Sequence, residues 1–267
     1  MSQKIHSKLF IKGKLHTLTG LHIGGNSGGL KVGGVNSVVV RNPLDNQPYI
    51  PGSSLRGKMR SLLERARGPE EKNSEEGGYN KEGLEKKNSE EGGYNKEGPG
   101  TNPKTLLGKL FGVGASEKSN EPTRLIVRDS FLTKESAKKL ELASNTDMPM
   151  TEVKTEVSIN RISSKANPRE IERVPAGAIF DLNFILTLYD KDEEIKFLNL
   201  FFESLSLIEG DSLGGHGSRG YGRVLFKELK ISQKTVEDYK NPKQEEQQFQ
   251  DYQIFLEALK NDKKKAI

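Results

Sequence analysis

The sequence contains no cysteine and only four histidines among its 267 residues. Without cysteine it forms neither disulfides nor thiolate metal sites, and the histidines lack zinc-type spacing. No apolar run reaches membrane length, and no signal peptide is recognisable. These absences predict a soluble cytoplasmic protein with no membrane contact. Hydrophobic residues make up only 33% and charged residues 30%, which indicates a modest core or a part of the chain that does not pack.

Glycine and positive charge are abundant instead. The net charge is +5 and the pI about 9.1, which permits a polyanionic partner without requiring one. Glycine is concentrated in Gly20–Ser37, which also contains His22 and has neither Asp nor Glu. Glycine lets another backbone come close, so this stretch predicts a loop or bulged hairpin against a ligand. A flexible surface loop is the alternative.

Residues 4–18 alternate between apolar and basic side chains. A period of two predicts a strand with one buried face and one basic face. The basic face favours a polyanion-binding surface over a merely solvated one, because no acid interrupts it. Its members are Lys4, His6, Lys8, Lys12, Lys14 and His16.

A helix is predicted at about 54–67, with Ser53 or Ser54 as its N-cap. The preceding residues nearly match a P-loop, but Met59 replaces the Ser or Thr that binds Mg²⁺, so a nucleotide hydrolase is disfavoured. Free N–H groups at a helix start, with two nearby cations, still predict a site for a backbone phosphate. A capped helix with surface charge is the alternative. The predicted contacts are Ser53, Ser54, Arg56 and Lys58.

A second Gly-rich loop at Gly214–Gly222 follows a predicted helix and enters a strand at Arg223–Ile231. It contains G-x-G-x-x-G, but a dinucleotide fold has the opposite order of strand and helix, so that interpretation is rejected. Glycines with Arg219 and Tyr221 suit a loop lying along a nucleic-acid backbone. His22 and His216 are candidate acid–base groups for RNA chemistry, although a single loop histidine more often only forms hydrogen bonds.

The order of strands and helices predicts an α+β fold with a ferredoxin-like, RRM-like core. One face of such a sheet can bind single-stranded RNA. KNSEEGGYNKEG occurs twice, at 72–83 and 87–98, and predicts a disordered insertion. The predicted divisions are a core (1–68, 105–150 and 176–231), the insertion (69–104), a projecting arm (151–175) and a charged tail with a helix (232–267).

Several segments together resemble the RAMP superfamily, and within it the repeated backbone subunit of type III-A CRISPR (Csm) effector complexes. They are GLHIGG, GGVNS, PYIPGSSLRGKMRSLLE, RLIVRDSFL, the arm TEVK…NRI…KANPREIER, and LGGHGSRGYGRV. The resemblance covers about 1–68 and 105–231. It implies a filament of copies along guide RNA, contact with target RNA and with other Csm subunits, and an arm that acts as a thumb over the guide–target duplex.

The family's target cleavage is implied to depend on an aspartate and on Mg²⁺ or another divalent cation, and that aspartate maps onto Asn36. An amide is a weak ligand for a hard cation, so cleavage and metal binding at Asn36 are expected to be impaired while RNA binding persists. Guide phosphates are expected at the start of the helix and at the loop containing Arg219. Arg161 and Lys165 of the arm are expected to face the duplex.

Three other functions remain open from the sequence. The first is a stand-alone endoribonuclease that processes precursor guide RNA, with His22 and a nearby lysine as an acid–base pair. The second is a purely structural filament subunit. The third is a nucleotide-binding enzyme built on Gly52–Lys58.

Overall fold

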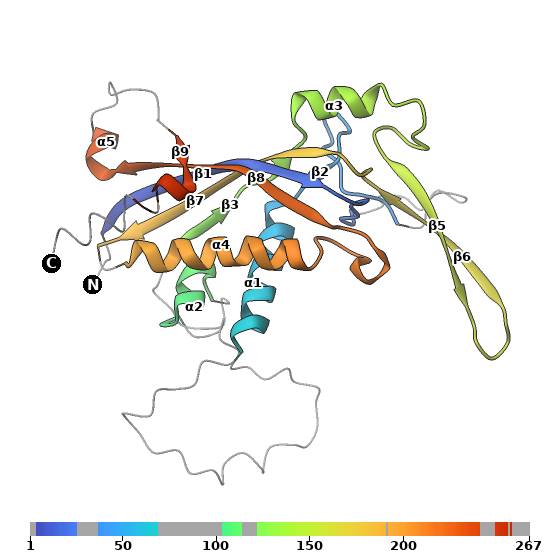
Figure 1. Ribbon diagram of the computed structural model, residues 1–267, viewed down its shortest axis with the longest axis horizontal. Helices are drawn as coiled ribbons and strands as arrows, with labels where there is room; N and C mark the ends of the chain where they lie inside the picture. The colour runs from blue at the N-terminus through green and yellow to red at the C-terminus, as the bar shows by residue number, and fades with distance from the viewer. Residues whose placement is uncertain are drawn as a thin grey trace, which may run out of the picture.

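A five-stranded antiparallel sheet with the order β3-β7-β1-β8-β9 forms the centre of the molecule (Figure 1). The computed structural model describes residues 4–25, 37–68, 103–113, 122–190, 192–240, 249–255 and 257. The strands are β1 (Ile5–Thr17), β3 (Leu125–Val127), β7 (Ile179–Tyr189), β8 (Val224–Thr235) and β9 (Gln250–Asp251). Taken in chain order with α1 (Gly52–Arg67) and α4 (Glu194–Gly210), the strands β1, β3, β7 and β8 follow the order β-α-β-β-α-β. This is the ferredoxin-like arrangement, and the predicted fold class is confirmed.

The core lies between one face of the sheet and the two helices α1 and α4 (Figure 1). The predicted alternation in β1 is present, and its apolar side chains Leu9, Ile11 and Leu15 are fully buried. Ile11 lies opposite Phe184 of β7 on one side and Ile231 of β8 on the other. The short helix α2 (Leu106–Phe111) packs against α1.

The opposite face of the sheet carries the basic side of β1. Helix α3 (Lys134–Glu141) stands over one end of this face and α5 (Val236–Lys240) over the other (Figure 1). Lys14 forms an ion pair with Glu228 at 2.9 Å, and Lys12 lies over the ring of Phe249. Whether this face binds a polyanion stays a prediction.

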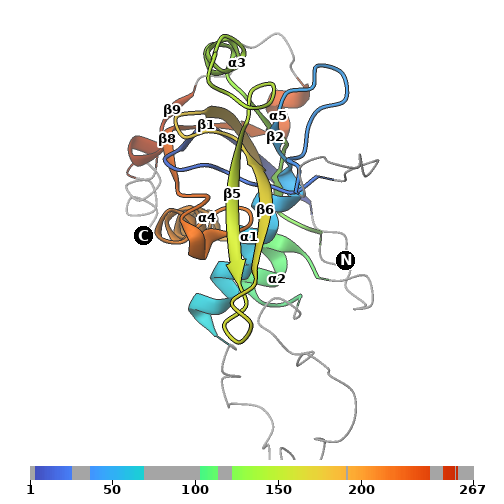
Figure 2. The same cartoon turned by 90° about the vertical axis from the view of Figure 1, so that its right-hand side faces the viewer.

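The arm forms a two-stranded hairpin that extends away from the sheet (Figure 2). Strand β5 (Glu152–Ile159) pairs with β6 (Ala166–Arg173) over their full lengths. Its distal half is exposed, including Val157, Ile159 and Ile162. At its base, Val174 pairs with Leu21, so the arm leaves the body beside the first Gly-rich stretch.

The structure corrects the predicted helix start. Helix α1 begins at Gly52, and neither Ser53 nor Ser54 caps it. The Asp129 carboxylate instead accepts a hydrogen bond from the Gly52 N–H at 2.7 Å. The segment Arg124–Leu132 does not form one continuous strand: it is interrupted after β3, where the Asp129 carboxylate makes this contact. The chain then forms the separate strand β4 (Ser130–Phe131), which pairs with β2 (Tyr49–Ile50).

Other expectations meet different outcomes. The short apolar run at 38–41 forms only isolated bridges, such as Val39 with Gly24. Strand β8 continues past Ile231 to Thr235. Residues 250–251 form β9, and the predicted tail helix is present in part, at residues 252–255 and 257. The duplicated repeats and residues 26–36, including Asn36, lie outside the described residues. Among the described helices, none has the length and apolar character needed to cross a membrane.

Candidate nucleic-acid interface

The two Gly-rich segments lie against each other at one end of the sheet. The Gly215 N–H donates to the His22 carbonyl and the Gly222 N–H to the Gly20 carbonyl, both at 2.9 Å. Gly214 has φ +78°, and a Cβ there would collide with the His22 carbonyl oxygen. The glycine at this position therefore serves loop-to-loop contact, which sequence density alone did not distinguish from ligand contact.

His22 and His216, the two candidate acid–base residues, meet at this contact. Their ring centroids are 5.4 Å apart in an edge-on arrangement. His22 is buried, and its Nδ1 lies 2.6 Å from the Glu172 carbonyl oxygen. Because a carbonyl only accepts, Nδ1 carries the proton, and Nε2 is the ring nitrogen left to accept. Burial lowers the pKa of His216, with a further contribution from His22, so His216 stays neutral to lower pH.

Glu172 connects the arm to the segments on both sides of residues 26–36. Its backbone N–H donates to the Ser37 carbonyl, while its carbonyl accepts from His22. Its carboxylate accepts from the Val39 N–H at 2.8 Å, from Thr151 at 2.6 Å and from Arg41 at 2.5 Å. The side chain is 1% exposed. A buried, fully partnered carboxylate in this position fixes how the chain enters and leaves the Gly-rich segment.

A second charged group joins the arm to the Gly214–Gly222 loop. We call it the junction cluster: Lys154, Glu156, Arg169, Arg219 and Tyr221. Arg169 donates to Glu156 at 2.9 Å, and Arg219 and Lys154 lie 3.8 and 4.0 Å from the same carboxylate. Figure 1 shows the loop after α4 at the end of the molecule from which the hairpin projects.

Tyr221 is buried within this cluster. Lys154 lies 4.7 Å and Arg173 4.9 Å from the centre of its ring. Burial raises the pKa of the Tyr221 hydroxyl, and the neighbouring Glu156 adds to the rise. Burial opposes ionisation of Glu156, but its hydrogen bonds and the nearby arginines lower its pKa overall. Glu156 is therefore anionic and Tyr221 neutral at physiological pH.

Two of the four predicted phosphate contacts at the start of α1, Arg56 and Lys58, already have protein partners. The Asp129 carboxylate occupies the first N–H of the helix. Arg56 points inward and donates to the Phe111 carbonyl, and burial lowers its pKa. Lys58 pairs with Asp211 at 3.0 Å, and this contact lowers the Asp211 pKa. Ser53 is exposed and Ser54 half-buried.

The predicted arm residues lie at the far end of the hairpin. Arg161 is in the turn between β5 and β6, and Lys165 follows it. Both are exposed, and within the described part of the chain no ion pair involves either of them. They therefore lie far along the hairpin from the junction cluster and are not part of it.

The described residues do not supply a metal site. No group of three or more His, Asp or Glu side chains among them is arranged to hold an ion. The Glu172 carboxylate beside the Gly-rich segment is already occupied by Arg41, Thr151 and Val39. The donor groups of the described residues therefore do not suit Mg²⁺, and position 36 lies outside them.

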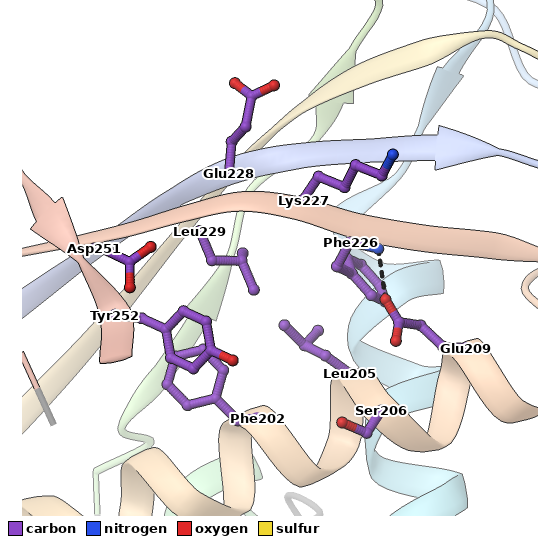
Figure 3. Close-up of a pocket in the computed structure, with 10 residues that line it drawn as sticks. All are labelled: Phe202, Leu205, Ser206, Glu209, Phe226, Lys227, Glu228, Leu229, Asp251 and Tyr252. Carbon is purple, nitrogen blue, oxygen red and sulfur yellow. Dashed lines mark hydrogen bonds between the residues drawn. The ribbon is translucent and has the colours of Figure 1, made fainter. Parts of the chain in front are cut away.

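A cavity lies elsewhere, between α4 and the edge formed by β8 and β9 (Figure 3). Its volume is about 200 Å³. Glu209 within it accepts from the Phe226 N–H at 2.7 Å, and Phe202 stacks on Tyr252. The strand bulges beside it, where Glu228 has φ +53°. No predicted site residue lines this cavity.

Sequence reasoning missed Glu156 and Glu172 as members of the site. A signal for the first was present: Glu152 and Glu156 lie directly opposite Arg173 and Arg169 once the arm is folded as a hairpin. In a hairpin, the residue numbers of directly facing residues add up to the same total. Opposite charges at such positions therefore indicate cross-strand pairs. Glu172 had no comparable signal, because its partners are not on the facing strand.

Several known proteins are similar to this chain. The RAMP superfamily pattern matches residues 14–225. A protein of Methanothermobacter thermautotrophicus named CRISPR system Cms endoribonuclease Csm3 is 36% identical, covering 89% of this chain and 91% of that protein. A Streptococcus thermophilus protein of the same name is also 36% identical, covering 85% and 90%.

Solved structures agree in fold. A structure of a Csm3–Csm4 subcomplex of the type III-A CRISPR-Cas interference complex aligns with TM-score 0.54 and 25% identity, covering 97% of both chains. A type III-B Cmr-beta complex bound to cognate target RNA aligns with TM-score 0.52 at 15% identity. It covers 84% of this chain and 61% of that one, and at this identity it supports the fold alone.

Proposed function

This chain belongs to the RAMP superfamily, and on that premise we propose that it is the guide-RNA-binding backbone subunit of a type III-A CRISPR effector complex. The observation that carries the proposal is the similarity to Csm3 proteins over more than four-fifths of both chains. Its partners in this role are guide RNA, target RNA, further copies of itself along the guide and other subunits of the complex.

The charges of the described residues support RNA binding. The end of the sheet from which the hairpin extends gathers Arg169 and Arg219, while Arg161 and Lys165 extend the positive charge along the hairpin. Neutralising backbone phosphates with such side chains releases counterions, so affinity should fall steeply with salt. Guide phosphates contact the Gly214–Gly222 loop and the surface around Lys58, and the hairpin reaches over the guide–target duplex.

The cleavage expected of the family is impaired in this chain. The relatives are named endoribonucleases, which supports a ribonuclease ancestry. We propose that position 36 is the cleavage position and that its amide cannot replace a carboxylate. A carboxylate there would hold a divalent ion that balances charge on the reacting phosphate. The residues around position 36 still position RNA. The contact between His22 and Glu172 holds the segment before this position, and Glu172 also holds the segment after it.

A reconstituted complex tests both parts. RNA binding measured at several salt concentrations should give a steep negative slope, and binding that ignores salt would contradict the charge-based interface. With Mg²⁺, the Asn36→Asp variant should cut bound target RNA at regular intervals while the parent chain does not. If the variant binds target RNA but gains no cutting, position 36 is not the cleavage position.

The contact between His22 and His216 favours a second candidate, a stand-alone endoribonuclease for precursor guide RNA. Two imidazoles with ring centroids 5.4 Å apart bring a potential acid and a potential base close together. Incubating the protein alone with precursor RNA separates the two candidates. Metal-independent cutting that is lost in His216→Gln would support the enzyme, and intact RNA would exclude it.

A further inference from the structure

The junction cluster carries more positive charge than its own acid neutralises. Lys154, Arg169 and Arg219 converge on the single carboxylate of Glu156, within 2.9 to 4.0 Å. The three cations come from two separate segments, the arm and the loop after α4. Their side chains are 39%, 40% and 51% exposed, whereas Glu156 is 10% exposed. The acid thus lies underneath, and the cations face solvent.

One donor of the cluster also lacks an acceptor. Arg169 Nε is buried and donates no hydrogen bond among the described residues, whereas the Tyr221 hydroxyl and the Glu156 carboxylate interact with each other. A buried donor without a partner costs stability, and it indicates a place where an added acceptor would be favourable.

Neighbouring charges do not complete the cluster. Arg173 is paired with Glu152 at 2.7 Å and contributes its guanidinium to the ring of Tyr221. His216 lies 3.3 Å from an Arg219 nitrogen and brings no negative charge. The region therefore keeps an excess of positive charge, which Glu156 neutralises only in part.

We propose that Arg169, Arg219 and Lys154 form a binding site for a backbone phosphate of single-stranded RNA, and that Glu156 occupies this site internally until the phosphate replaces it. The inference rests on the proposed RNA-binding function. A phosphodiester has acceptor oxygens only, and the planar fork of arginine matches it in geometry. A polymer is the fitting ligand because Arg161 and Lys165 continue the positive charge along the same hairpin.

This arrangement gives Glu156 a regulatory effect on affinity. The carboxylate holds the two arginines in place and so prepares the site before RNA arrives. It also competes with the incoming phosphate, because like charges about 4 Å apart repel even in water. Removing its charge while keeping its shape should therefore strengthen RNA binding, the opposite of what loss of a merely structural ion pair would do.

The test compares Glu156→Gln with Glu203→Gln, in the full chain, for binding of labelled oligouridylate across a salt series. The control carboxylate also pairs with an arginine, Arg67 at 2.5 Å, but on the helical side of the molecule. Glu156→Gln should bind about fivefold more tightly at low salt, with a steeper salt slope, while Glu203→Gln should match the parent. Adding Arg169→Ala to Glu156→Gln should abolish the gain.

Inorganic phosphate provides an independent readout. It should raise the thermal midpoint of Glu156→Gln more than that of the parent, because the emptied site gains a ligand. If phosphate has this effect but no variant binds RNA, the site stands and the proposed function fails. If the parent binds RNA and Glu156→Gln binds no more tightly, the further inference is overturned.

A second variant covers failure of Glu156→Gln to fold. Arg219→Gln removes the most exposed of the three cations, 3.8 Å from the carboxylate. It should weaken RNA binding and reduce the salt slope by about 1. An unchanged affinity and slope in Arg219→Gln would equally overturn the proposal.

Discussion

The Nδ1 atom of His22 donates a hydrogen bond to the backbone carbonyl of Glu172, 150 residues away in the chain, at 2.6 Å. The same glutamate binds Ser37 through its N–H and Val39 through its carboxylate. One residue of the arm thus holds both ends of the first Gly-rich stretch. The positions of these two ends relative to the arm are therefore fixed by hydrogen bonds to Glu172.

Replacing Glu172 should be severely destabilising. Glu172→Ala leaves Arg41, Thr151 and the Val39 N–H without their buried acceptor, and breaking one side of a buried ion pair costs about 3 kcal/mol or more. Urea unfolding measures the effect. Glu203→Ala, at an exposed pair with Arg67, serves as control and should cost less than about 1 kcal/mol. Equal losses in the two variants would contradict the role given to Glu172.

Two glycines of α1 should respond to alanine with opposite signs. A Cβ at Gly52 would collide with the Val127 carbonyl oxygen, a backbone atom that cannot move away easily. Gly52→Ala should therefore cost about 2 kcal/mol. Gly57 is exposed with open space around its missing Cβ, so Gly57→Ala should stabilise the helix by about 1 kcal/mol.

Thermal or urea unfolding of both glycine variants checks these signs. RNA binding by Gly57→Ala adds a second result. A variant that is more stable yet binds RNA more weakly would show that the RNA backbone comes close to this turn of the helix. Stabilisation by Gly52→Ala would contradict the packing described for the helix start.

Lys58 should contribute to guide binding through its charge. Lys58→Ala should weaken RNA affinity and reduce the salt slope by about 1. Asp211→Asn releases Lys58 from its 3.0 Å ion pair and should strengthen binding. Lys196→Ala is the control, because it also removes a lysine that is paired with a carboxylate. Its partner is Glu193, directly before α4. If Lys58→Ala and Lys196→Ala bind RNA alike, the guide phosphate lies elsewhere.

Two histidines predict how stability depends on pH. Burial lowers the pKa of His16, aided by Lys227, and burial with His22 lowers that of His216, both from an ordinary value of 6.5. Between the folded and unfolded pKa values, the unfolded chain binds more protons, so stability rises with pH there. The free energy of unfolding should therefore fall as pH drops below about 6.5.

Denaturant unfolding at pH 7.5 and pH 5.5 measures this loss, and the double variant His16→Gln/His216→Gln should show a smaller one. Protonation of carboxylates also reduces the free energy of unfolding as pH falls, but at lower pH. The pKa of Asp211, for example, is lowered by its contact with Lys58. Identical pH dependence of the parent and the double variant would contradict the assignment to these two histidines.

Local pattern was sufficient for much of the fold. The alternation in β1, the apolar stripe of α1 and the run of apolar residues in β7 each identify the face that becomes buried, because burial repeats with the period of the element. The hairpin of the arm was also predictable from its extended, charged sequence. The helix cap at α1 was predicted incorrectly, because the acceptor is supplied by Asp129, 77 residues away.

The sequence by itself determined the ferredoxin-like order of elements, the absence of cysteine chemistry, the two Gly-rich segments and the resemblance to the RAMP superfamily. Only the tertiary structure decided that Glu172 holds both ends of the first segment and that Glu156 gathers cations from the arm and the second one. The physical reason is that periodicity reports which side of an element meets the core. Hydrogen bonds and ion pairs between distant segments depend on where the folded backbone places each side chain.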